Sequence, residues 1–373
     1  MSVAEETGAT RVEVRSAGGG YDVLVGPGLL QRLPVLLEDV VDAGRFAIIS
    51  DSNVAPLHGD AALEVLREAG LDAALFTFPA GEASKTRKSW SILTDELLEA
   101  GFGRDACVVA VGGGVTTDLA GFVAATYLRG IPVVQVPTSY LAMIDASVGG
   151  KTGVDVKAGK NLVGAFHPPR LVVADPEVIS TLPSGERAQG LVEALKHGAI
   201  LDLRHYEELV QELDALLDAN PVVATSLIAD SVSLKAAVVT EDEFESGYRQ
   251  VLNFGHTLGH ALEAASGYAL GHGSAVAWGM LLEAEVGERM GITEPGTRAR
   301  LEPVLSPFAG SLPSSIALGE VLPYLRTDKK VRGGKPRVVL LRRIGEVDPG
   351  TRWSHEAPEE LLEAVLREAL ERA

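Results

Sequence analysis

The sequence predicts an α/β N-terminal domain, built on a Rossmann-like parallel sheet with helices on both faces, and a mainly α-helical C-terminal domain. Three observations support this prediction. The chain of 373 residues is longer than one hydrophobic core usually grows. Apolar runs alternate with helical patterns in residues 1–180, as expected for a parallel sheet covered by helices. Residues 181–373 instead contain long stretches rich in Ala, Leu and Glu, which predict helices.

Each element follows from its local pattern. Short apolar runs predict buried strands at 46–50, 73–77, 107–111, 132–136 and 171–174. Helical patterns are found at 61–69, 89–100, 186–201, 206–219, 221–240, 255–266 and 272–290. The end of the chain adds a strand at 337–341 and an amphipathic helix at 358–373, whose leucines we interpret as packing residues.

Composition and charge favour a cytoplasmic protein. The formal net charge of −18 repels nucleic acid and anionic membrane surfaces, so neither is expected as a partner. The single Cys107 cannot form an internal disulfide, and the first residues lack a basic start followed by an apolar stretch. No apolar run is expected to approach the length of a membrane span. Because the chain as a whole is acidic, an anionic ligand would have to bind in a local basic pocket.

A glycine run, Gly112, Gly113 and Gly114, follows the strand expected at 107–111 and enters a helical stretch. Glycines let the backbone approach a phosphate closely, and a helix N-terminus offers free N–H groups. The run favours a dinucleotide pyrophosphate site, but it lacks the G-x-G-x-x-G spacing, so a tight strand-to-helix turn is the alternative. Asp51, after the first of these strands, could accept from a ribose hydroxyl or cap a helix.

Three cations next to glycines suggest an anion-binding pocket. The segment 148–152 does not have P-loop spacing and is better interpreted as a flexible turn that presents Lys151. Lys160 and Arg129 have similar glycine neighbours. Single surface cations are usually solvated, but three of this kind in so acidic a chain favour one shared pocket.

Three histidines and a glutamate suggest a metal centre. His256, His260 and His272 lie close together in the sequence, and Glu193 lies upstream of them. Imidazole nitrogen and carboxylate oxygen bind zinc-like divalent ions, and a site with three protein ligands leaves a position open for substrate. The general-base glutamate of the H-E-x-x-H pattern is missing, which disfavours a protease. Spacing alone does not decide which histidines are ligands, and hydrogen-bonded core histidines are the alternative.

A series of motifs, in order along the chain, resembles the 3-dehydroquinate synthases of the sugar-phosphate cyclase family. These motifs lie at 81–86, 112–122, 129–130, 137–138, 145–152, 159–161, 193–196, 245–249, 253–260, 272–273 and 328–330. The order and number of the matches make the resemblance more specific than any one motif. Ser139-Tyr140 and Met143 depart from the commonest pattern, and we interpret Tyr140 and Met143 as packing variants.

The resemblance implies an NAD-binding domain at 1–180 and a metal- and substrate-binding domain at 181–373. It implies the lyase reaction of the shikimate pathway, in which 3-deoxy-D-arabino-heptulosonate 7-phosphate (DAHP) becomes 3-dehydroquinate and phosphate. NAD is regenerated in each turnover, and one divalent ion, zinc or cobalt, assists. A homodimer is also implied, in which Arg129 acts in its own or the neighbouring subunit.

The resemblance also assigns residues to roles. The implied metal ligands are Glu193, His256 and His272. The implied catalytic and substrate-binding residues are Arg129, Asp145, Lys151, Asn161, Lys196, Lys235, Glu245, Arg249, Asn253 and His260, with one lysine of Lys329–Lys330. The implied cofactor-binding residues are Gly81, Glu82, Lys85, Gly113, Gly114, Val115, Thr116, Thr117, Asp118, Thr138, Ser139, Lys151, Lys160, Val178 and Thr181. Asp51 joins them from its place after the first strand and not from the resemblance.

Three alternatives remain open. One is another sugar-phosphate cyclase with a different substrate, which Asn253, His260 and the late lysine pair disfavour. The second is a metal-dependent polyol or alcohol dehydrogenase, which would have no use for the predicted anion pocket. The third is a non-catalytic binding protein, which would have no use for a set of metal ligands together with candidate general bases.

Overall fold

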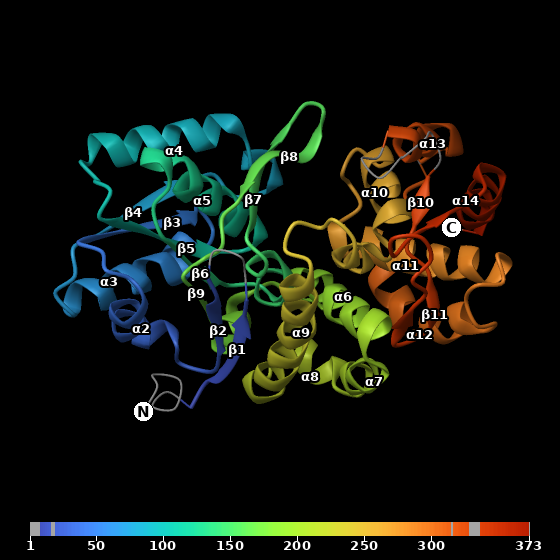
Figure 1. Ribbon diagram of the computed structural model, residues 1–373, viewed down its shortest axis with the longest axis horizontal. Helices are drawn as coiled ribbons and strands as arrows, with labels where there is room; N and C mark the ends of the chain where they lie inside the picture. The colour runs from blue at the N-terminus through green and yellow to red at the C-terminus, as the bar shows by residue number, and fades with distance from the viewer. Residues whose placement is uncertain (1–7, 16–18, 315, 328–335, 373) are drawn as a thin grey trace. The chain divides into compact units, whose positions relative to one another are not determined.

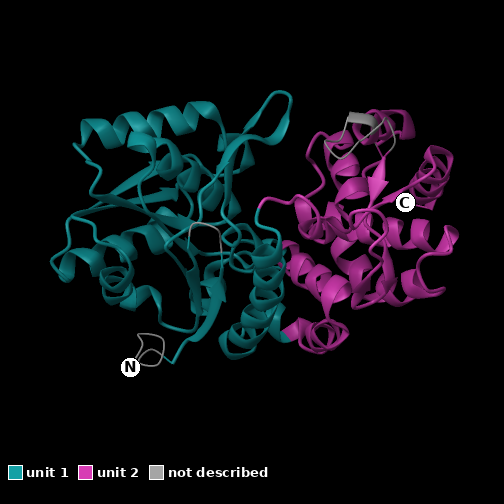
Figure 2. Ribbon diagram, viewed as in Figure 1, with its two compact units in different colours: residues 1–187, 215–243 teal, residues 188–214, 244–373 magenta. Residues whose placement is uncertain are grey.

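The structure is a computed structural model that describes residues 8–15, 19–314, 316–327 and 336–372. The chain divides into two compact units, coloured separately in Figure 2. Unit 1 comprises residues 1–187 and 215–243, and unit 2 comprises residues 188–214 and 244–373. The expected division at residue 180 into an NAD-binding domain and a metal- and substrate-binding domain stays a prediction, because compactness assigns no function to either unit.

Unit 1 is built on a seven-stranded sheet of order β1-β2-β9-β6-β5-β3-β4. The strands are β1 (Thr10–Val14), β2 (Tyr21–Val25), β3 (Arg45–Asp51), β4 (Ala73–Phe78), β5 (Ala106–Gly112), β6 (Val133–Pro137) and β9 (Leu171–Ala174). All neighbours pair in parallel except β1 and β2, which are antiparallel. Every residue of β5 is buried, as expected for a central strand covered on both faces. The predicted parallel sheet is confirmed.

Helices cover both faces of this sheet. Figure 1 shows α4 (Arg87–Glu99) and α5 (Gly114–Thr126) on one side, and α2 (Leu33–Val40) and α3 (Asp60–Glu68) on the other. The core under α4 and α5 contains Leu93 from α4, Leu119 from α5 and Val108 from β5. Short helical turns complete the unit: η1 (Leu30–Arg32), η2 (Ala55–Gly59), η3 (Glu82–Ser84), η4 (Tyr127–Arg129), η5 (Ala142–Ala146) and η6 (Pro176–Thr181).

Two hairpins of unit 1 were not predicted. One is the β1–β2 pair at the edge of the main sheet. The other joins β7 (Lys151–Val156) to β8 (Gly159–Phe166) in a separate two-stranded sheet. Gly149 and Gly150 precede β7 with φ of 102° and 68°. The predicted glycine turn before Lys151 is therefore present, and a strand follows it.

Unit 2 is mainly helical, as predicted. Its helices include α6 (Ser184–Leu201), α7 (Leu203–Gln211), α8 (Leu213–Leu217), α10 (His256–Ala265), α11 (His272–Arg289), α12 (Thr297–Ala309), α13 (Leu318–Thr327) and α14 (Glu359–Arg372). Helices α6 and α8 each cross a boundary between the two units. A shorter helical turn, η7 (Tyr248–Asn253), precedes α10. Leu258 of α10, Leu282 of α11 and Leu362 of α14 share one core. The predicted packing role of the terminal helix is thus confirmed.

Two predicted elements of the second half are interrupted. The helix expected at 206–219 is divided into α7 and α8. The strand expected at 337–341 becomes β10 (Arg337–Val338) and β11 (Leu341–Arg343), which pair with β13 (His355–Glu356) and β12 (Glu346–Val347). The continuous apolar run therefore serves two small sheets instead of one strand.

Helix α9 (Pro221–Glu241) belongs to unit 1 although it follows α8. Within the described residues, α9 alone is long and apolar enough to cross a membrane. Its most apolar window of 18 residues has a mean hydropathy of 1.7. The expectation that no apolar run approaches this length is therefore wrong. Because α9 packs against β1 and η6 and 56% of that window is buried, we interpret it as a core helix.

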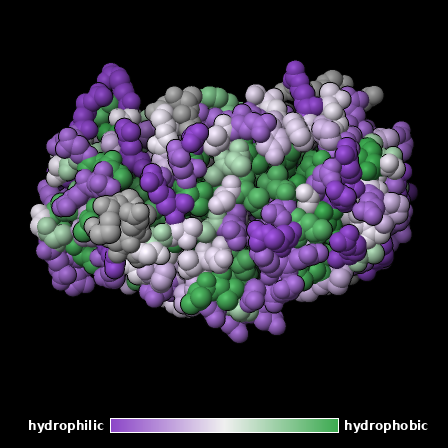
Figure 3. All heavy atoms as spheres, turned by 60° about the horizontal axis from the view of Figure 1, so that its bottom comes forward, coloured by the Kyte–Doolittle hydropathy of each residue, from purple (hydrophilic) through white to green (hydrophobic). Residues whose placement is uncertain are grey.

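The surface of the molecule is rich in charged side chains. The chain has 51 acidic and 33 basic residues. Figure 3 shows hydrophilic side chains over much of one face, with apolar side chains between them. Many of the charged groups of unit 2 are paired with one another.

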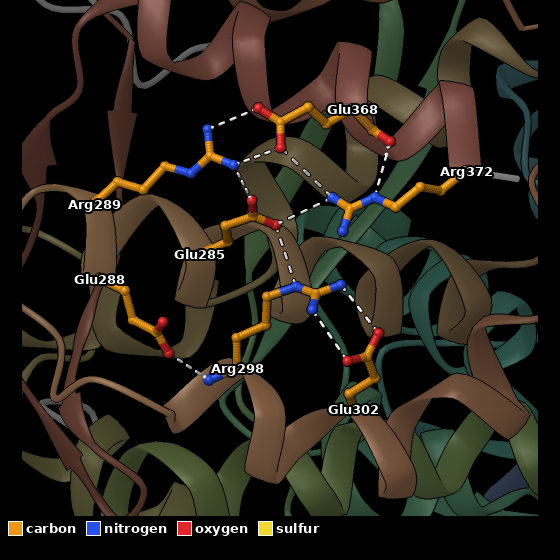
Figure 4. A network of polar contacts seen from close by, with 7 residues as sticks. All are labelled: Glu285, Glu288, Arg289, Arg298, Glu302, Glu368 and Arg372. Atoms are coloured by element: carbon orange, nitrogen blue, oxygen red, sulfur yellow. Dashed lines mark hydrogen bonds and ion pairs between the residues drawn. The ribbon is translucent and has the colours of Figure 1, made fainter.

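One ion-pair network ties together three helices of unit 2 (Figure 4). Glu285 of α11 pairs with Arg289 one turn later and with Arg298 of α12 at 3.2 Å. Glu368 of α14 pairs with Arg289 at 2.5 Å. Glu285 is only 9% exposed, whereas Arg289 and Glu368 face solvent, so the shielding from water is limited to the Glu285 end of the network.

Candidate functional site

Three predicted metal ligands come together inside unit 2. Glu193 lies on α6, and His256 and His272 are the first residues of α10 and α11. The Nε2 atoms of His256 and His272 lie 3.5 Å and 3.4 Å from the same oxygen, Glu193 Oε1. One donor atom from each residue lies within 4.8 Å of the others. Two imidazole nitrogens and a carboxylate oxygen suit zinc or cobalt, so these residues fit a divalent metal ion.

The backbone before α10 orients His256. Gly255 has a left-handed conformation with φ of 78°, which glycine adopts without strain. His256 Nδ1 lies 3.1 Å from the carbonyl oxygen of Phe254. When Nδ1–H donates to that carbonyl, Nε2 keeps its lone pair on the side that faces Glu193. This is the tautomer that a metal ligand needs.

Gln189 joins α6 to the start of α11. Its Oε1 accepts from the backbone N–H of Ser274 at 3.0 Å, and its Nε2 donates to the Ser274 hydroxyl at 3.0 Å. A side chain at Gly273 would meet the Gln189 carbonyl oxygen at 2.3 Å, so the two backbones are in direct contact. This contact brings Glu193, one turn further along α6, to His272.

Glu193 carries its own counter-charge. Its side chain is fully buried, and Lys196 on the next turn of α6 is 2% exposed. Lys196 Nζ pairs with Glu193 Oε2, whereas Oε1 faces the two imidazoles. Burial lowers the pKa of His272, but the hydrogen bond and charge of Glu193 outweigh burial and raise it above the usual value.

His260 lies beside the three-ligand cluster. Its ring centroid is 5.0 Å from that of His256 and 6.0 Å from that of His272. Together with Glu263 and His272 it forms a second group of donor atoms within 4.8 Å of one another. Glu263, which is 4% exposed, was missed in the sequence. Its position three residues after His260 on one helix could have revealed it.

The segment before α10 gathers three predicted substrate residues. Asn253 Nδ2 donates to Glu245 Oε1 at 2.7 Å. Arg249 is 2% exposed on η7 between them. Glu245 has a left-handed backbone with φ of 55°, which costs a non-glycine residue conformational energy. Such strain is common where a side chain must be aimed at a ligand.

The glycine run of unit 1 forms the predicted strand-to-helix turn. β5 ends at Gly112 and α5 begins at Gly114, so the N–H groups of this first turn are available to an anion. Asp51 accepts from the N–H groups of Asn53 at 2.9 Å and Val54 at 3.2 Å, and from the Thr116 hydroxyl at 3.2 Å. These bonds fix the turn between β3 and η2, whose N-cap residue is Val54, so Asp51 is not the helix cap, and its role at a ribose hydroxyl stays a prediction.

A charge cluster centred on the buried Lys85 adjoins this turn. Lys85 Nζ lies 3.0 Å from Asp118 Oδ2 and 3.4 Å from Glu82 Oε1, and Lys160 Nζ lies 3.7 Å from Glu82. Burial lowers the pKa of Lys85, but Asp118, Glu82 and Asp155 outweigh it, so this pKa lies above its usual value. Burial raises the pKa of Asp118, and Lys85 offsets part of that rise. The ammonium group of Lys85 thus stays charged.

The comparison with family models decides the classification. Residues 75–189 match the model of the 3-dehydroquinate synthase N-terminal domain, and residues 190–331 match that of the C-terminal domain. The chain belongs to the 3-dehydroquinate synthase family.

This chain is similar to individual 3-dehydroquinate synthases over most of its own length and of theirs. The chain is 45% identical over 331 residues to 3-dehydroquinate synthase of Symbiobacterium thermophilum, covering 88% of this chain and 92% of that protein. It is 42% identical over 360 residues to that of Xylella fastidiosa strain 9a5c, covering 94% and 89%.

Solved structures of related cyclases share the fold. A 2-deoxy-scyllo-inosose synthase complexed with carbaglucose-6-phosphate, NAD+ and Co2+ is 27% identical, with a TM-score of 0.89 over 96% of this chain and 100% of that one. A 2-epi-5-epi-valiolone synthase of Streptomyces hygroscopicus with NAD+ and Zn2+ bound is 29% identical, with a TM-score of 0.84 over 95% and 97%.

In this member of the 3-dehydroquinate synthase family, the predicted residues divide between the units. All predicted metal ligands belong to unit 2, and all predicted cofactor residues belong to unit 1. The predicted substrate residues of unit 1 are Arg129, Asp145, Lys151, Asn161 and Lys235, and those of unit 2 are Lys196, Glu245, Arg249, Asn253 and His260. Lys329 and Lys330 lie outside the described residues.

The unit 1 substrate residues of this 3-dehydroquinate synthase family member are also held in defined positions. Lys235 Nζ donates to Asp145 Oδ1 at 2.5 Å and to its backbone carbonyl oxygen at 2.6 Å. Arg129 and Asn161 have left-handed φ of 73° and 55°. With Glu245, they make three predicted substrate residues with this unusual conformation, which is consistent with functional strain.

The remaining cofactor positions lie in turns of unit 1. Ser139 Oγ accepts from the N–H of Ala142 at 3.3 Å, and Thr138 is 5% exposed after β6. Thr181 Oγ1 lies 2.8 Å from His58 Nε2, and Val178 is buried in the same turn, η6. His58, a residue that the sequence did not single out, therefore fixes the Thr181 side chain.

Proposed function

We propose that this protein is a 3-dehydroquinate synthase, which converts DAHP to 3-dehydroquinate and phosphate in the shikimate pathway. The observation that carries the proposal is the convergence of Glu193, His256 and His272 at one point in unit 2. Family membership and the 45% identity to a 3-dehydroquinate synthase support the substrate assignment.

The proposed cofactors are catalytic NAD and one zinc or cobalt ion. When bound, NAD supplies a hydride acceptor and donor, and the metal ion stabilises negative charge that develops on substrate oxygens. Oxidation of one ring alcohol to a ketone acidifies the neighbouring C–H, which permits loss of phosphate. Reduction of the ketone, ring opening and an internal aldol step complete the reaction, so no net oxidation remains.

The residues of unit 2 bind and orient the substrate in this proposal. The guanidinium of Arg249 suits the carboxylate or phosphate of DAHP, because its planar donors match paired oxygens. The Glu245–Asn253 hydrogen bond fixes the amide of Asn253 for contact with a hydroxyl. His260 stands beside the metal ligands, where its imidazole can accept and return a proton.

The residues of unit 1 bind the dinucleotide in this proposal. The first turn of α5 at Gly114 offers N–H groups to the pyrophosphate. Lys85 and Asp118 lie next to that turn and fix each other by an ion pair at 3.0 Å. Lys151 and Lys160, at the starts of β7 and β8, add positive charge for an anionic ligand.

Another sugar-phosphate cyclase is the second candidate, since two cyclases with other substrates share the fold at 27% and 29% identity. Their lower identity, against 42% and 45% for 3-dehydroquinate synthases, favours DAHP. Iron-containing alcohol dehydrogenases are only 16% and 17% identical, and this likeness concerns the fold alone.

We also propose that the protein is a cytoplasmic homodimer in which Arg129 acts in its own or the neighbouring subunit. The left-handed pair Leu128 and Arg129 supports a special role for this turn. The test mixes inactive Arg129→Ala and His256→Ala variants under conditions that exchange subunits. Recovered activity supports action on the neighbouring subunit, and lasting inactivity with proven exchange assigns Arg129 to its own subunit.

The test of the function itself is phosphate release from DAHP by the purified protein with NAD and zinc. Absorbance of the reduced nicotinamide is followed in the same sample. Stoichiometric phosphate without accumulated reduced cofactor, with 3-dehydroquinate as product, is the expected result. Activity on another sugar phosphate only would indicate a different cyclase, and steady NAD reduction with a polyol would indicate a dehydrogenase. His256→Ala is the matched inactive control.

A further inference from the structure

Glu283 of α11 accepts hydrogen bonds from three backbone N–H groups around His256. Its Oε2 accepts from Gly255 at 2.8 Å. Its Oε1 accepts from Thr257 at 3.0 Å and from Leu258 at 3.2 Å. Glu283 is fully buried, so these bonds are shielded from water. The residues that donate lie on both sides of the predicted metal ligand.

These bonds supply what the start of α10 lacks. The first N–H groups of a helix have no partner within the helix, and the side chain of the N-cap residue usually accepts from them. Here the N-cap residue is Gly255, which has no side chain. A carboxylate also interacts favourably with the positive end of the helix dipole. Glu283 therefore caps α10 from a neighbouring helix.

From this geometry we infer that Glu283 is a positioning residue for His256, and hence for the metal ion. The inference rests on the proposed metal site. Glu283 fixes the backbone from Gly255 to Leu258, and with it the direction in which the His256 side chain leaves α10. The Phe254 carbonyl that holds His256 Nδ1 precedes the same turn. Rotation of this turn would move both the ligand and the group that orients it.

The separation of the two helices is fixed by other contacts. A side chain at Gly279 would meet the Gly255 carbonyl oxygen at 1.7 Å, and one at Gly259 would meet the Ala275 carbonyl oxygen at 2.6 Å. Helices α10 and α11 are thus in backbone contact at these two glycines as well. What Glu283 adds is the orientation of the first turn of α10, which carries the ligand.

The test compares zinc binding by the parent protein and Glu283→Gln. Glutamine keeps the size of the side chain but places an NH2 group against a backbone N–H, so one of the two acceptor positions is lost. We expect the zinc dissociation constant, measured by competition with a chromophoric chelator, to rise roughly ten-fold. The visible absorption spectrum of the cobalt-substituted variant should also change, because the ligand geometry at the metal changes.

Glu285→Gln is the matched control, because Glu285 lies two residues later on α11 and binds Arg289 and Arg298 instead of α10. It should lower stability while the parent zinc affinity and cobalt spectrum are kept. Zinc affinity of Glu283→Gln equal to that of the parent would overturn the inference. If Glu283→Gln does not fold, Glu283→Asp decides by the same two measurements. A parent protein that binds no zinc would instead refute the proposed metal site.

Discussion

Lys196 pairs with Glu193 three residues earlier on α6, in a part of unit 2 where both side chains are almost completely buried. The carboxylate that faces the imidazoles of His256 and His272, the proposed metal ligands, therefore has a cation on its other side before any metal ion binds. A buried charge without a partner would be costly, and this pair avoids that cost. The metal-free protein should consequently be folded.

Lys196→Met should destabilise the metal-free protein. The substitution leaves the Glu193 carboxylate buried without its cation, which costs about 3–5 kcal/mol. Zinc should recover part of the loss, because it supplies positive charge at the same carboxylate. Urea unfolding with and without zinc measures both effects. Arg342→Ala, which removes exposed pairs at 3.0 Å and 3.3 Å, is the control and should cost at most about 1 kcal/mol. Equal losses in the two variants would contradict the prediction.

His256→Ala should abolish turnover and leave the fold intact. Removal of one of three ligands weakens metal binding, while the Glu283 cap of α10 remains. Metal content after dialysis, circular dichroism and phosphate release are the measurements. His355→Gln, which alters a histidine that pairs with Asp348 at 3.1 Å, should keep both metal and activity. Near-normal activity of metal-stripped His256→Ala would refute the metal assignment.

His205 should make the protein less stable as pH falls. Burial, assisted by the neighbouring His197, lowers the pKa of His205 from 6.5 to about 4. The unfolded chain therefore binds this proton below pH 6.5, whereas the folded protein does not bind it until about pH 4. Since the unfolded state binds more protons in this window, the free energy of unfolding decreases as pH falls.

His205→Gln should flatten this dependence of stability on pH. The full contribution of a shift of this size is about 3 kcal/mol between the two pKa values. Urea unfolding of the parent and the variant across the window gives the two slopes. Identical slopes would show that His205 does not titrate differently in the folded and unfolded states.

Gly279→Ala should destabilise unit 2 and weaken zinc binding together. Its methyl group would meet the Gly255 carbonyl oxygen at 1.7 Å, so α10 and α11 must separate. Overpacking of this kind costs about 1–3 kcal/mol or more. Gly185→Ala on α6 is the control, because nothing lies within 4 Å of its added methyl group. Thermal unfolding and zinc titration of both variants check the prediction, which fails if Gly279→Ala behaves like the control.

Local patterns predicted the central strands but not the hairpins. The run at 107–111 is entirely apolar and corresponds to the fully buried β5. In β8, however, every position is exposed or partly exposed, and the short apolar stretch 162–166 is interrupted by Gly164, so the local pattern does not reveal a strand. β7 begins directly after a glycine turn, and only its pairing with β8 shows that it is a strand. Pairing of this kind is a tertiary property.

The site follows the same distinction. The family resemblance implied Glu193, His256 and His272 as metal ligands, whereas spacing alone could not separate His256 from His260 on one helix. In the structure the Nε2 of His256 faces Glu193, whereas His260 groups with Glu263 and His272, and the choice of His256 as the ligand stays a prediction. Glu283 could not be found from the sequence, since it acts on residues 25 to 28 positions away.

The glycines between α10 and α11 limit how this protein can be redesigned. Backbone atoms, not side chains, set the spacing of the two helices that carry His256 and His272. Directed evolution toward other sugar phosphates would therefore find few tolerated substitutions along that seam. Useful variation should accumulate in the segment 245–253, where side chains of a short turn, rather than helix backbones, decide which groups are presented.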